Sequence, residues 1–190
     1  DMVTTPDGSL VAMVHSNNGT TDLNAWVNLF KEFADSIGAD VDMNQMYGTL
    51  YNKALEGDAD CGGILSYGNY AGEPITNVEK GRPMVVRTPE TKFNLANFMR
   101  SHLYTALGVI KVGMDILTKD EGVEIDTVLG HGGLFKTKGV GQKILADAIN
   151  TPVVVMETAG EGGPWGMAIL AEYMVKREEG EKLEGYLKNK

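Results

Sequence analysis

The fold is decided by Thr127-Val-Leu-Gly-His-Gly-Gly-Leu-Phe-Lys-Thr-Lys-Gly-Val-Gly-Gln-Lys-Ile-Leu-Ala-Asp147, which predicts a strand, a glycine-rich turn and a helix in immediate succession. Glycines at 130, 132 and 133 let the backbone approach a ligand without an intervening Cβ atom. The following helix points free N–H groups and its positive dipole end at any bound anion. The stretch therefore predicts a cradle for phosphate. The open alternative is a glycine turn that serves the fold alone.

A second glycine turn stands downstream, at Glu161-Gly-Gly-Pro-Trp-Gly-Met-Ala-Ile-Leu-Ala171, directly before an apolar helix. Between the turns, Thr151-Pro-Val-Val-Val-Met156 is a proline-led run of β-branched residues, which is typical of a short buried strand. The order is strand, glycine turn and helix, twice over. Both turns follow strands, so an α/β sheet places them on the same edge, where ligands bind.

Two sharper nucleotide motifs are excluded, because neither a Walker A sequence nor a Rossmann fingerprint fits residues 130 to 144. The lone Cys61 has no partner for a disulfide or a metal pair, which favours a small structural residue. No metal site is predicted on the chain. His102 lies in an apolar stripe and is expected to be a hydrogen-bonded core histidine, whereas His131 stands inside the phosphate turn.

Composition limits the class of protein and its partners. With 190 residues and 43% hydrophobic content, the chain can bury the core of one domain or of one lobe. A net charge of −9 argues against nucleic acid or an anionic membrane as partner. Nucleotides stay open, because ATP arrives with Mg²⁺ and backbone amides can hold its phosphates. No run approaches membrane-span length, and cytoplasm is the expected compartment.

Apolar spacing predicts helices over residues 23–37, 43–55 and 94–118, each with one buried face. The tyrosines and methionines of the second helix are expected in the core. A strand is predicted at residues 10–14. The connection over residues 57–92 lacks helical periodicity, and its Leu65–Pro74 portion fits either a ligand-facing loop or a surface loop.

From residue 94 to residue 171 the chain resembles the C-terminal domain of the FGGY carbohydrate kinases. The resemblance rests on the long helix, the Gly-Gly turn, the helix ending Gln142…Ala146-Asp147, the Pro-Val strand and Glu161…Gly166-x-Ala168. It extends upstream to Tyr67-x-x-Tyr-Ala-Gly-Glu-Pro74, which is similar to a Gly-Glu-Arg-x-Pro segment of the family but lacks its arginine. Within the family, the sequence Gly-His-Gly-Gly-Leu-Phe at residues 130–135 is most similar to pentulose kinases of the xylulokinase and ribulokinase type.

The resemblance implies an actin-like ATPase domain of the ribonuclease H-like kind, an α/β fold with a mixed sheet and flanking helices. Residues 1–190 would then be the C-terminal, nucleotide-binding domain of a longer two-lobed kinase, excised from its N-terminal lobe. That missing lobe would supply the catalytic aspartate and most sugar contacts. The implied partners are ATP with Mg²⁺, a small-molecule sugar and the N-terminal lobe, and homodimerisation stays open.

The family's nucleotide contacts carry over to both glycine turns. Gly132 and Gly133 would lie against the α-phosphate and ribose. Leu134, Lys136 and Thr137 would line the adenine side. The other wall of the cleft would be closed by Gly163, Trp165 and Gly166. Asp147 matches a family position that we interpret as a structural cap or an interhelix contact.

The resemblance thus implies an ATP-dependent kinase of a ketopentose, of xylulokinase type, with ribulokinase or another FGGY sugar or polyol kinase as the alternative. The isolated chain is expected to bind nucleotide weakly and to phosphorylate nothing. Two other functions stay open. One is an actin-like ATPase that is not a sugar kinase, and the other is a binding domain whose glycine turns are purely structural.

Overall fold

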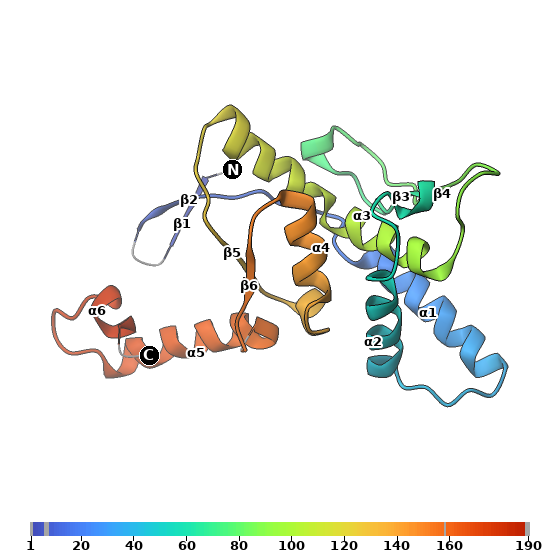
Figure 1. Ribbon diagram of the computed structural model, residues 1–190. Helices are drawn as coiled ribbons and strands as arrows, with labels where there is room; N and C mark the ends of the chain where they lie inside the picture. The colour runs from blue at the N-terminus through green and yellow to red at the C-terminus, as the bar shows by residue number, and fades with distance from the viewer. Residues whose placement is uncertain (1, 6–7, 158, 189–190) are drawn as a thin grey trace.

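The computed structural model describes residues 2–5, 8–157 and 159–188. The chain opens with an antiparallel hairpin of β1 (Met2–Thr4) and β2 (Leu10–Ala12), in which Val3 lies opposite Val11. The hairpin lies at the left of Figure 1 and is exposed along both strands. The predicted strand at residues 10–14 is confirmed in its first part.

Three helices build the main core: α1 (Thr21–Ser36), α2 (Met43–Ala54) and α3 (Leu95–Asp115). They match the predicted helices to within a few residues. The side chains of Asp42 and Asn94 cap α2 and α3 by accepting the N–H groups of Gln45 and Asn97. Their apolar stripes meet over α3, where Met99 and Leu103 are fully buried. Helices α2 and α3 therefore begin at local side-chain caps, and all three helices are held by long-range packing.

The connection between α2 and α3 holds a small antiparallel pair, β3 (Leu65–Tyr67) and β4 (Met84–Val86). Short 3-10 turns at Cys61–Gly63 and Pro74–Thr76 flank β3. The pair rests on α3, because the Thr105 hydroxyl donates to the Ser66 carbonyl at 2.9 Å. A loop that looked irregular in sequence is thus fastened to the central helix (Figure 1).

The decisive stretch folds as predicted. β5 (Val128–Gly130) leads through a 3-10 turn at Gly133–Phe135 into α4 (Val140–Ile149), and β6 (Val153–Val155) returns parallel to β5. Gln142 secures this unit by donating its side-chain amide to the Val153 carbonyl at 2.6 Å. Because the strands are parallel, both glycine turns leave from the same edge, as the sequence predicted.

The described strands form three two-stranded sheets, of which two are antiparallel and one is parallel. After β6, a 3-10 turn at Ala159–Glu161 leads into α5 (Gly162–Lys176), which is followed by α6 (Leu183–Leu187). The glycines of the second turn were expected before this helix, but the helix begins at Gly162 and takes Gly163 and Gly166 into its first turns. Figure 1 shows α5 and α6 set apart at the lower left.

Candidate functional site

The turn after β5 depends on glycine at particular positions. A Cβ atom at Gly130 would lie 2.7 Å from the Phe135 ring, so only glycine leaves room for that ring. Gly132 has φ of +104° and Gly139 has φ of +80°, a region that side chains rarely adopt. Gly133, in contrast, has open space around it and an ordinary φ. The turn is therefore shaped by Gly130, Gly132 and Gly139.

Two cavities open on either side of this turn, and His131 lines both. The smaller, about 390 Å³, is bounded by the two glycine turns and is called here the glycine cavity. Its walls are His131, Gly132, Gly160, Gly162 and Gly163. It therefore offers backbone groups at the first turn of α5, the end of a helix that favours anions.

The larger cavity, about 680 Å³, is called here the tyrosine cavity. Its floor is the glycine turn from Gly133 to Thr137, and its other walls come from α1, α2 and α3. Tyr47 and Tyr51 of α2 face it, together with Asn24 of α1. The Tyr47 hydroxyl donates to Asn24 Oδ1 at 3.0 Å, so an aromatic wall carries an ordered polar pair. Burial, and secondarily Tyr47, raises the pKa of Tyr51, which stays a neutral hydroxyl.

The structure divides the predicted nucleotide contacts among these cavities. Gly132 and Gly163 line the glycine cavity. The tyrosine cavity takes Gly133, Leu134, Lys136 and Thr137.

Trp165 and Gly166 do not line either of these two cavities. Both face a third, largely apolar cavity of about 860 Å³ between α5 and α6, which Gly163 also reaches. Both positions lie in the first turns of α5, which begins at Gly162, and they share this cavity with residues of α6.

Sequence reasoning missed Asn24, Asn44, Tyr47 and Tyr51. The tyrosines were assigned to the core because they share the apolar stripe of α2, and Tyr51 is indeed only 4% exposed. Both tyrosines nevertheless line the tyrosine cavity. The available signal was chemical: a buried tyrosine hydroxyl needs a partner, and asparagines are the nearby candidates.

The two glycine turns are held against each other. Lys136 Nζ lies 3.5 Å from Glu161 Oε1, and both side chains are exposed, so this ion pair adds little stability. A Cβ atom at Gly162 would lie 2.9 Å from His131 Nδ1, which shows how closely the imidazole packs on the start of α5. Among the residues that line the glycine cavity, His131 therefore supplies the imidazole that a ligand would meet.

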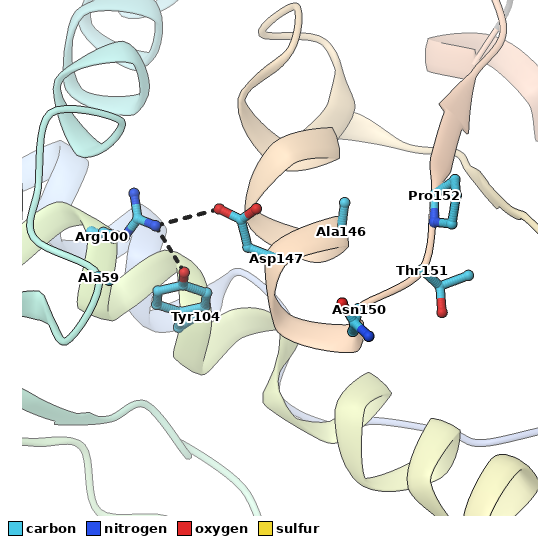
Figure 2. A pocket seen from close by; sticks show the side chains of 8 residues that line it. All are labelled: Ala59, Arg100, Tyr104, Ala146, Asp147, Asn150, Thr151 and Pro152. Carbon is cyan, nitrogen blue, oxygen red and sulfur yellow. Dashed lines mark hydrogen bonds and ion pairs between the residues drawn. The ribbon is translucent and has the colours of Figure 1, made fainter.

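A separate cavity of about 650 Å³ lies between α3 and α4 (Figure 2). Figure 2 shows the Arg100 guanidinium directed at Asp147 and Tyr104. Arg100 donates to the Tyr104 hydroxyl at 2.9 Å and to Asp147 Oδ2 at 3.4 Å. Asp147 thus makes an interhelix contact, as the sequence predicted.

Across residues 2–5, 8–157 and 159–188, no group of three or more His, Cys, Asp or Glu side chains could hold a metal ion. In the same ranges, no helix is both long enough and apolar enough to cross a bilayer.

The sequence was then compared with known proteins. The model for the C-terminal domain of the FGGY family of carbohydrate kinases matches residues 1–175. The chain belongs to this family. A comparison with curated proteins found no match. The resemblance predicted from the glycine turns is therefore confirmed at the level of the family.

Solved structures share the fold at low identity. Xylulose kinase from Bifidobacterium adolescentis is 18% identical, with a TM-score of 0.55 over 80% of this chain and 29% of its own. Gluconate kinase from Lactobacillus acidophilus is 18% identical, with a TM-score of 0.59, and the match covers 86% of this chain and 31% of the gluconate kinase. Plasmodium falciparum glycerol kinase with ADP is 19% identical, with a TM-score of 0.57 over 84% and 30%.

The family model and these solved structures together establish the architecture. The fold is the actin-like, ribonuclease H-like domain of FGGY kinases, with mixed helices and strands. The chain spans about 30% of the length of the glycerol kinase that it matches.

Proposed function

We propose that this FGGY chain is the nucleotide-binding lobe of an ATP-dependent carbohydrate kinase. One observation carries the proposal: two cavities of different chemistry meet at His131, on the turn that follows β5. One cavity is walled by glycine backbone, and the other by tyrosines and amides. A nucleotide has the same division, with an anionic phosphate chain at one end and an aromatic base at the other.

In this proposal the phosphates occupy the glycine cavity. Gly132 and Gly163 let the backbone approach the phosphate oxygens, and the α5 N-terminus adds a favourable dipole. Ribose and adenine occupy the tyrosine cavity, over Gly133 and Leu134 and beside Lys136 and Thr137. Tyr47 and Tyr51 give the base an aromatic wall, and the Asn24 amide is placed to accept or donate one hydrogen bond.

The reaction proposed for the longer kinase is transfer of the γ-phosphoryl group of Mg·ATP to a hydroxyl of a ketopentose, as in a xylulokinase. Mg²⁺ would neutralise phosphate charge there, held mainly by the nucleotide, since the described residues offer no carboxylate cluster. The catalytic aspartate and the sugar contacts are proposed to lie on an N-terminal lobe. We place the protein in the cytoplasm and expect the isolated chain to be catalytically inactive.

A carboxylate placed in the site tests the nucleotide proposal. Gly133→Asp is sterically permitted, and it adds negative charge between the base and phosphate positions. We expect titration calorimetry with MgADP to show saturable binding by the wild-type chain and at least about a tenfold loss in this variant. Gly185→Asp, in open space on α6, makes the same charge change and should bind like wild type. Equal affinity of Gly133→Asp and wild type would contradict the assignment.

The sugar is tested on the longer protein with an ADP-release assay across D- and L-xylulose, D- and L-ribulose, glycerol and gluconate. The neighbours named above include xylulose, gluconate and glycerol kinases, so this panel spans their chemistry. Turnover on one ketopentose would identify the substrate, and turnover on ribulose alone would favour the ribulokinase alternative. If no sugar in the panel gives turnover and the chain still binds MgADP, the result would favour an actin-like ATPase that is not a sugar kinase.

A further inference from the structure

Glu73 is a buried carboxylate far from either glycine turn. It is fully buried, and among the described residues its Oε1 atom has no hydrogen-bond partner. Burying a charge with one unsatisfied oxygen costs free energy, which an apolar side chain of similar size would avoid. The contacts of its other oxygen, Oε2, therefore indicate what this carboxylate does.

That other oxygen, Oε2, holds consecutive residues of the segment before α1. It accepts hydrogen bonds from the Ser16 hydroxyl at 3.1 Å, the Asn17 N–H at 3.0 Å and the Asn18 side-chain amide at 3.1 Å. A charged acceptor makes each of these bonds stronger than a neutral one would. One oxygen atom thus fixes both the backbone and the side chains of residues 16–18.

The carboxylate is itself held firmly in place. Glu73 pairs with Val78 through both backbone groups, at 2.7 Å and 3.1 Å. Asn18 and Ala71 add a reciprocal pair, in which the Ala71 N–H donates to Asn18 Oδ1 at 2.8 Å and Asn18 Nδ2 donates to the Ala71 carbonyl at 3.1 Å. The loop of Glu73 and the segment of residues 16–18 are therefore joined by a network of hydrogen bonds.

Residues 16–18 lead directly into the tyrosine cavity. The next two residues, Gly19 and Thr20, line that cavity. One turn further along α1, Asn24 forms the polar pair with Tyr47. Of the residues that the structure describes, none caps the start of α1 with its side chain, so the position of this wall depends on the segment that precedes it.

We propose that Glu73 is a positioning residue of the nucleotide site, which sets the Gly19–Thr20 wall of the tyrosine cavity through residues 16–18. The inference rests on the proposed function, because it assigns that wall to the nucleoside end of a bound nucleotide. It acts on the nucleoside and not on the phosphates, since the glycine cavity shares none of these residues.

The experiment measures three affinities of the chain: for adenosine, for MgADP and for magnesium pyrophosphate. Glu73→Ala removes all contacts of Oε2, and we expect it to weaken adenosine and MgADP by a common factor on the order of tenfold. Pyrophosphate affinity should stay at the wild-type value. Glu73→Gln, which keeps one acceptor oxygen, should recover most of the loss. Glu79→Ala, an exposed glutamate on the same loop, is the matched control and should leave all three unchanged.

The outcomes separate the two proposals. A wild-type chain that binds none of the ligands would refute the nucleotide site itself. A wild type that binds, with Glu73→Ala equally tight for adenosine, would overturn only the positioning role. Uniform weakening that includes pyrophosphate would also overturn it, since it indicates general loss of structure. If Glu73→Ala does not fold, Ser16→Ala removes one of the three bonds to Oε2, together with the bond that the Ser16 hydroxyl accepts from the Asn18 N–H, and should weaken adenosine binding about threefold. Unchanged adenosine affinity in that variant would overturn the proposal.

Discussion

The contact between Arg100 and Asp147 links the central helix to the helix of the glycine turn, and its strength can be worked out from the structure. The Arg100 side chain is 7% exposed, and within the part of the chain that the structure describes its buried Nε atom has no hydrogen-bond partner. Asp147 is 36% exposed, with 3.4 Å between the charged atoms. Removing the carboxylate therefore leaves a buried guanidinium whose remaining hydrogen bond among the described residues is the one it donates to the Tyr104 hydroxyl.

The expected loss follows from these exposures. Breaking a fully buried pair costs about 3–5 kcal/mol, and breaking an exposed pair costs about 0–1 kcal/mol. With one partner buried and the other partly solvated, we expect Asp147→Asn to lower the free energy of unfolding by about 2 kcal/mol. With an m-value of about 2 kcal/mol/M for urea, the unfolding midpoint should fall by about 1 M.

Urea unfolding followed by circular dichroism measures this change. The control is Asp35→Asn, which removes the partner of Lys31 on the surface of α1 and should shift the free energy by less than about 0.5 kcal/mol. In a double-mutant cycle, Arg100→Met should remove most of the cost of Asp147→Asn, because no buried charge is then left unpaired. A stability of Asp147→Asn within about 0.5 kcal/mol of wild type would refute the reasoning.

Two further predictions concern α3. Burial lowers the pKa of His102, and Asp22, whose carboxylate lies 3.1 Å from the imidazole, opposes part of that shift. The unfolded chain therefore binds the proton more readily than the folded chain. The free energy of unfolding should then fall as the pH drops below the ordinary histidine pKa of 6.5. In denaturation curves from pH 8 to pH 5, His102→Gln should flatten the dependence of the free energy of unfolding on pH. The control His15→Gln, at an exposed position, should keep that dependence. An equal pH dependence in both variants would count against the assignment. Asn94→Ala removes the cap of α3 and should lower the free energy of unfolding in urea by about 1 kcal/mol. The control Asn28→Ala, at an exposed position of α1, should leave that free energy almost unchanged. Equal losses in the two variants would show that the cap is not the source of the stability.

Local signals explain why much of the fold could be predicted. The stripe of α3 and its Asn94 cap are set within a few residues of sequence, so the helix was found almost to its ends. The same holds for β5 and β6, where β-branched runs and the intervening α4 dictate parallel pairing. The family likeness followed from that unit, because its glycines are required by geometry at Gly130 and Gly132.

The start of α5 shows where local signals fail. Pro164 is tolerated in the first turn of a helix, and Gly162 and Gly163 do not forbid one, so nothing nearby fixes the first residue. A difference of a few residues at that point rotates every later side chain by about 100° per residue. Trp165 therefore does not line the glycine cavity or the tyrosine cavity, although the helix that carries it, α5, was predicted.

The tyrosine cavity could not be predicted from periodicity, because its walls come from segments that are remote in sequence. Helical spacing says only that Tyr47 and Tyr51 share the buried stripe of α2. Whether that stripe meets protein or an opening depends on how α1 and the glycine turn pack against it. The hydroxyl of Tyr47 finds its partner 23 residues away, at Asn24. Polar atoms on an apolar stripe must be satisfied somewhere, so such atoms, more than the glycines, mark the position at which this core opens into a cavity.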